Sequence, residues 1–173
     1  MEQIIASVWE FLGDNTAEVV ALCALFFTAF QLHATRKHNK LSVKPHLVTF
    51  VNRNREPGKG SLSAKLMNNG LGPAIIKNYQ IYLDGKMLEI KSSKEAEETL
   101  KKILHDKKLI TTSATLLGKR YAMPSKESKD IMIVNFVLER DNEFEEIESR
   151  LKFDLVVEYE SIYGEEYIFD SRK

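Results

Sequence analysis

Apolar residues dominate one stretch near the start of the chain, residues 17–32, where only three polar side chains interrupt them. Extending the stretch to 16–35 gives twenty residues, about the length that a helix needs to cross the hydrocarbon core of a bilayer. Its Val, Leu and Phe side chains contribute roughly −2.5 to −5 kcal/mol to insertion, and its polar residues lie mostly near the ends. The pattern predicts a transmembrane helix over residues 14–38. The alternative is a buried helix of a soluble domain.

The charges on either side of this stretch differ in sign. The first 35 residues contain four acidic and no basic residues, whereas the remaining 138 contain all 25 basic residues and carry a net charge of +4. Because basic flanks stay on the cytoplasmic side, we expect a single-pass protein of the inner (cytoplasmic) membrane, with its N-terminus outside. Residues 39–45 are then a basic juxtamembrane linker. The residues expected at the membrane interface, against lipid headgroups, are Trp9, Arg36, Lys37, Lys40 and Lys44.

Residues 1–13 place their aliphatic side chains, at positions 4, 5, 8 and 12, on one helical face. We interpret them as a short interfacial amphipathic helix that ends at Gly13. The alternative is one continuous helix from Glu2 to about Lys40.

Small and polar residues recur within the apolar stretch at alternating spacings of four and three. This spacing places them along one face of a helix, while the large apolar residues lie elsewhere. In a bilayer, small residues let two backbones approach closely, and Thr and Gln hydrogen-bond across the contact. We therefore predict a homo-oligomer that associates through Ala17, Ala21, Ala24, Thr28, Gln31 and Thr35.

The chain after residue 45 alternates between strand-like runs and turns. Several runs carry apolar residues at every second position, and Asp84-Gly85 is a typical hairpin turn. Two runs have helical spacing instead, after the capping residues Ser92 and Asn142. Residues 46–173 are thus predicted to form a mainly-β domain, an antiparallel immunoglobulin-like β-sandwich with two short inserted helices. The strands are expected at 46–52, 62–68, 74–83, 87–90, 109–117, 131–137, 153–160 and 165–169.

Three turn motifs carry a resemblance to known proteins. N-G-L-G-P-A follows one strand at residues 69–74, P-S-K-E-S precedes a buried strand at 124–128, and E-Y-E-S-I-Y-G closes the last hairpin at 158–164. With these turns in this order, residues 41–173 resemble small bacterial single-pass membrane proteins of uncharacterised function that have an immunoglobulin-like cytoplasmic β-sandwich. The resemblance implies a fold and a membrane anchor, and it implies no activity.

The sequence offers few candidates for chemistry. The histidines stand at positions 33, 38, 46 and 105, and none pairs with a cysteine or carboxylate at metal-ligand spacing. The one cysteine, Cys23, lies in the apolar stretch, where it cannot act as a nucleophile in water. Neither Gly58-x-Gly60 nor Gly70-x-Gly72 has the strand–loop–helix context of a phosphate loop. We therefore predict no enzyme activity, no catalytic residues, no metal and no cofactor.

A basic cluster in the predicted loop at 54–60 and beside it is a candidate partner surface. Nucleic-acid binding would require aromatic residues interleaved with the charges, and only Phe50 is near, so we predict no nucleic-acid partner. The acidic residues between 143 and 148 are interpreted as a solvated helix face. The residues of the candidate partner surface are Arg53, Arg55, Lys59 and Lys65.

Three functions follow from these features. The leading hypothesis is a membrane-anchored cytoplasmic interaction module that self-associates or docks a protein partner at the membrane. The first alternative is a membrane-perturbing effector or toxin of the anti-phage defence type, which oligomerises through its transmembrane helix. The second alternative is an enzyme whose site residues are dispersed in the sequence.

Overall fold

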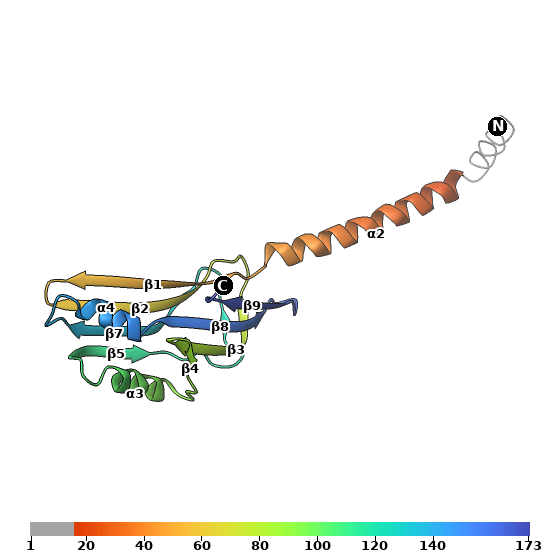
Figure 1. Ribbon diagram of the computed structural model, residues 1–173. Coiled ribbons are helices and arrows are strands. Elements are labelled where there is room, and N and C mark those ends of the chain that lie inside the picture. Colours follow the sequence, from red (N-terminus) through yellow and green to blue (C-terminus); the bar gives the residue numbers. More distant parts are fainter. Residues whose placement is uncertain (1–15) are drawn as a thin grey trace. The chain divides into compact units, whose positions relative to one another are not determined.

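The computed structural model describes residues 16–173 (Figure 1). The chain divides between Ser42 and Val43 into two compact units, which we describe separately. The interfacial helix predicted at 1–13, with Trp9, and the first two residues of the predicted spanning helix lie outside the described residues.

Helix α2 (Thr16–Ser42) contains the apolar stretch and is long and apolar enough to cross a membrane. It continues through the first part of the predicted linker, so the non-helical connection begins only after Ser42. Pro45 explains this end, because a proline disfavours helical backbone at the residue before it and lacks the N–H that a helix requires.

The strands of residues 43–173 form two antiparallel sheets (Figure 1), which confirms a mainly-β domain. One sheet has the order β1-β2-β7-β5, and the other has the order β4-β3-β8-β9, with β6 paired to β3. The strands are β1 (Leu47–Glu56), β2 (Lys59–Asn68), β3 (Ala74–Leu83), β4 (Lys86–Met87), β5 (Leu109–Ala114), β6 (Ala122–Met123), β7 (Ser128–Val137), β8 (Phe153–Glu160) and β9 (Glu166–Asp170).

One cluster of buried side chains joins the two sheets. Leu66 from β2 and Ile131 from β7 pack with Ile76 from β3 and Leu155 and Val157 from β8, and each is at most 1% exposed. Burial of these apolar side chains is the main term that holds the two sheets together.

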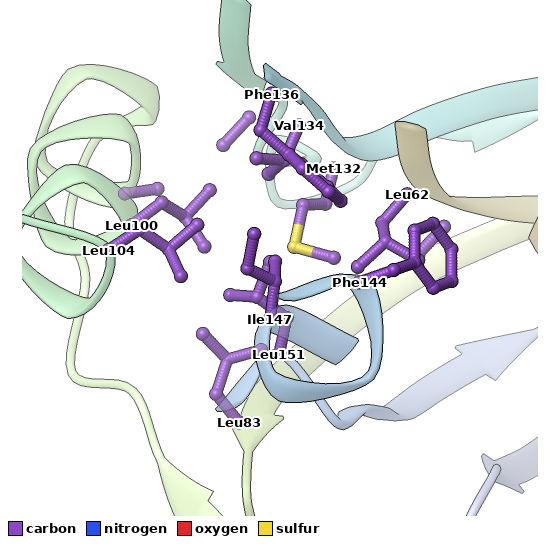
Figure 2. Close-up of a cluster of buried hydrophobic side chains, with 13 residues drawn as sticks. Leu62, Leu83, Leu100, Leu104, Met132, Val134, Phe136, Phe144, Ile147 and Leu151 are labelled. Carbon is purple, nitrogen blue, oxygen red and sulfur yellow. The ribbon is translucent and has the colours of Figure 1, made fainter. Parts of the chain in front are cut away.

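A second cluster attaches both helices of the domain, α3 (Ser93–Ile103) and α4 (Glu143–Arg150), to the first sheet. Figure 2 shows Leu100 of α3 and Ile147 of α4 pointing toward the side chains of β2 and β7. The ring of Phe144 lies 5.9 Å from that of Phe136, between ring centroids. The two inserted helices predicted from the sequence are therefore present, and each buries one apolar face.

The two predicted helix caps differ in outcome. The Ser92 hydroxyl accepts a hydrogen bond from the Glu95 N–H at 3.1 Å, as the capping-box pattern predicts. Asn142 makes no side-chain cap bond, because its backbone (φ −92°, ψ 3°) is not the extended conformation of a typical N-cap residue. The Glu143 carboxylate instead accepts from the Glu139 N–H at 2.7 Å.

The prediction of a loop at residues 54–60 is wrong. β1 and β2 stay paired from Leu47↔Asn68 to Glu56↔Lys59, and only Pro57 and Gly58 form the turn. Polar residues in this part of the hairpin obscured the strand pattern. Gly58 has a φ of +75°, which lets the chain reverse within two residues.

The return strand predicted at 87–90 is also shorter than expected. The Asp84-Gly85 turn is present, with φ values of 49° and 72°, but β4 ends at Met87. Leu88 and Ile90 pack against the core instead of continuing the strand.

Candidate interaction surfaces

The apolar side chains of α2 are exposed. None of its residues is buried, and Leu22, Leu25 and Phe26 are 67–72% exposed. Exposed apolar side chains in such number are typical of a segment that contacts lipid or another chain.

The stripe predicted for self-association lies on this continuous helix, so its spacing does place Ala17, Ala21 and Ala24 on one face. The other members, Thr28, Gln31 and Thr35, continue the same face. The Thr28 hydroxyl donates to the Ala24 carbonyl within the helix at 2.7 Å. This bond satisfies its donor, so Thr28 would contribute to a helix contact as a small residue and as an acceptor.

The basic residues predicted at the membrane interface separate into two groups. Arg36, Lys37 and Lys40 belong to the C-terminal part of α2. Lys44 belongs to the domain, where its ammonium lies 5.4 Å from the centre of the Tyr167 ring. This cation–π contact gives Lys44 a partner within the domain, and its place at the lipid headgroups stays a prediction.

The candidate partner surface does not form one patch. Residues directly opposite in β1 and β2 share a face, and Lys59 and Lys65 lie opposite Glu56 and Phe50. Arg53 and Arg55 lie on the other face, because side chains alternate along a strand. The expectation of a single basic surface on a loop is therefore wrong.

The arginines of the hairpin are paired within the domain. Arg53 Nε lies 2.7 Å from a Glu148 carboxylate oxygen of α4, and Arg55 lies 2.8 Å from Glu145. Arg55 also donates to the carbonyl of Asp141 at 2.6 Å. Glu148 and Glu145 of α4 thus neutralise Arg53 and Arg55. The partners are far apart in the sequence, so the sequence pattern does not indicate this pairing.

Lys107 is a buried cation whose burial the sequence pattern does not predict. Its side chain is 1% exposed, and its ammonium lies 2.8 Å from Glu146 and 3.4 Å from Glu143. The hydrogen bond to Glu146 raises the pKa of Lys107, and the same bond lowers the pKa of Glu146. A lysine between polar neighbours in the sequence gives no signal of burial, so only the fold identifies this network.

Arg150 extends the network at the C-terminal end of α4. It donates to both carboxylate oxygens of Asp106, at 2.6 and 3.1 Å, and to Glu146 at 2.6 Å. The bond from Arg150 lowers the pKa of Asp106 to about 2. Together, Lys107 and Arg150 tie α4 to the chain that precedes β5.

A groove of about 510 Å³ opens between the β1–β2 hairpin, α4 and the start of β8. Val51, Leu62 and Met132 give it apolar walls, and Arg53 and Glu148 pair with each other beside them. Such a lining offers apolar contact area and few free polar groups, which fits a protein surface better than a small charged ligand.

Within residues 16–173, no group of three or more His, Cys, Asp or Glu residues has the geometry of a metal site. No known protein family, curated protein or solved structure matches this chain.

Proposed function

We propose that the chain is a membrane-anchored interaction module. In this proposal α2 spans the inner membrane, with the N-terminus outside. Residues 43–173 are a cytoplasmic domain of the immunoglobulin-like sandwich type that self-associates or docks a protein partner at the membrane.

The observation that carries the proposal is the exposure of α2. At 1.5 Å per residue, its 27 residues span about 40 Å, more than the roughly 30 Å of a bilayer core. Lipid would cover the apolar side chains that the described chain leaves in water. Arg36, Lys37 and Lys40 at its C-terminal end favour a cytoplasmic location of that end.

The distribution of side chains on α2 supports self-association. The small residues Ala21 and Ala24 share a face with Thr28, whereas Phe26 and Phe30 lie on other faces. Backbones that approach closely along a small-residue face gain dispersion contacts that lipid does not offer.

Substitutions of equal size on two faces of α2 test this proposal. In Ala24→Leu the larger side chain separates two helices that meet on the stripe, so the fraction of oligomer in liposomes decreases. Ala29→Leu makes the same change about 140° away around the helix and leaves the oligomer intact. Energy transfer between labelled full-length chains measures both.

Equal energy transfer in wild type, Ala24→Leu and Ala29→Leu would remove the stripe from the proposal. Depolarisation of the membrane on expression, abolished by Ala24→Leu, would favour the membrane-perturbing effector over the interaction module.

A further inference from the structure

Strand β1 is a long edge strand. It pairs with β2 on one side only, and no other described element of the domain lies beyond it (Figure 1). Residues 50–56 are all exposed. A free edge of this length presents unpaired N–H and C=O groups that another strand can bind.

The register of the hairpin determines which groups these are. The His46 carbonyl accepts from the Asn69 N–H at 2.8 Å, and hydrogen-bonded residues alternate along an antiparallel pair. The even-numbered residues of β1 therefore bond to β2, and the odd-numbered residues direct their backbone groups outward. Among these, Leu47 is 1% exposed, so a second strand cannot reach its backbone.

Four residues remain at the free edge. In the described part of the chain, none of their outward N–H and C=O groups has a hydrogen-bond partner. They are Thr49, Val51, Arg53 and Arg55.

Charged side chains commonly block such edges. Here Glu148 and Glu145 of α4 hold the side chains of Arg53 and Arg55 through bonds of 2.7 and 2.8 Å. Both guanidinium groups are therefore directed to α4 and neutralised, and the backbone edge beside them stays accessible.

We propose that β1 pairs with β1 of a second copy, antiparallel and about a twofold axis at Asn52. The inference names a contact surface in the cytoplasmic domain for the self-association proposed above, and it rests on that function. In this register Thr49 lies opposite Arg55 and Val51 lies opposite Arg53, so all four outward residues of each copy are paired. About eight hydrogen bonds form.

Neighbouring twofold registers are less favourable. An axis at Arg53 places two guanidinium groups directly opposite each other, which is destabilising. An axis at Val51 requires Leu47, which is buried. The axis at Asn52 also places Phe50, which is 56% exposed, beside Asn54 of the second copy and removes part of its ring from water.

Single cysteines in the full chain, with Cys23 replaced by alanine and the protein in liposomes, test this register. Asn52→Cys places the two sulfur-bearing residues in a non-hydrogen-bonded pair, about 4.5 Å apart between Cα atoms, which suits a disulfide. Asn54→Cys separates the two cysteines by four strand positions, about 13 Å, and this distance excludes a disulfide. We expect mild oxidation to cross-link Asn52→Cys at least tenfold faster than Asn54→Cys.

Proline at an outward position gives a second, independent test. Val51→Pro in the Asn52→Cys chain removes an N–H that points away from β2, so the domain stays folded while the cross-link is lost. Asn52→Pro instead removes a ladder hydrogen bond to β2 and destabilises the domain. Circular dichroism separates the two effects.

The pairing would be overturned if three variants cross-linked equally: Asn52→Cys, Asn54→Cys and the distant surface variant Leu71→Cys. Random collision would then explain the cross-links. Absence of the Asn52→Cys cross-link, while Ala24→Cys cross-links in α2, would overturn the edge pairing and leave self-association through the helix intact. Absence of both would overturn both.

Discussion

The Nε atom of Arg53 lies 2.7 Å from a carboxylate oxygen of Glu148, so the edge strand β1 and helix α4 are joined although they are far apart in the sequence. The bond directs the arginine away from the free edge of the strand and toward the groove beside α4. One ion pair therefore influences two surfaces at which the domain could meet a partner.

Charge reversal at this pair tests whether it holds α4 against the hairpin. Arg53→Glu places two carboxylates together, and we expect faster hydrogen exchange at α4 amides and a stability loss of up to about 1 kcal/mol, since the pair is partly exposed. Adding Glu148→Arg restores the attraction and the wild-type exchange rates. Unchanged exchange in Arg53→Glu would show that the ion pair does not position α4.

Replacement of the buried lysine has a larger expected effect. Lys107→Met leaves Glu143, whose side chain is 7% exposed, with only the exposed Arg140 at 3.9 Å as a cation. A poorly compensated buried charge is strongly destabilising. We expect the melting temperature of the full chain in detergent to fall by several degrees. Lys108→Met, at a position 70% exposed, is the matched control and leaves the melting temperature within about one degree.

Acid should destabilise the domain through the same network. The pKa values of Glu143 and Glu146 lie below 4.5 in the folded chain, and that of Asp106 is lowered from 3.8 to about 2. Because the unfolded chain binds these protons more readily, stability is fully present above about pH 6 and is lost as pH falls through 4.5 toward the folded pKa values. Melting temperatures across this range measure the loss.

A variant of Arg150 tests the cause of the low pKa of Asp106. Arg150→Met removes the hydrogen bond that contributes most to lowering the pKa of Asp106, and this pKa should then rise from about 2 toward 3.8 in a nuclear magnetic resonance titration. An Asp106 pKa that stays at about 2 in this variant would contradict the assignment of Arg150 as its cause.

Gly60 marks a close approach of β2 to the aromatic pair beneath α4. A Cβ at this position would lie 2.6 Å from Cζ of Phe136 and 3.0 Å from Cδ2 of Phe144. Gly60→Ala should therefore cost about 1–3 kcal/mol in denaturant unfolding. At Gly118 an added Cβ meets no atom within 4 Å, so Gly118→Ala should change stability by less than about 0.5 kcal/mol.

Much of the fold can be predicted from the sequence because local patterns determine it. Strand β8 occupies the predicted residues 153–160, since its alternating apolar side chains face one core. Helix α3 begins after Ser92, where the hydroxyl satisfies a backbone N–H that the helix leaves unpaired. In both elements the information lies within a few neighbouring residues.

The features that could not be predicted depend on contacts between distant residues. The Arg53 side chain has an environment set by α4, and Lys107 is buried only because α4 brings Glu143 and Glu146 to it. The end of β1 was missed for the same reason, since its polar residues pair with β2 and α4 rather than with a core. Composition and periodicity do not predict contacts between residues that are far apart in the sequence.

The proposed membrane anchoring requires α2 to lie in a bilayer, and extraction of membranes with alkaline carbonate tests this most directly. If α2 spans the membrane, the full-length chain stays with the membrane pellet after the wash, floats with lipid in a density gradient and enters solution only with detergent. Recovery of the chain in the carbonate supernatant, without detergent, would show that α2 does not span a membrane.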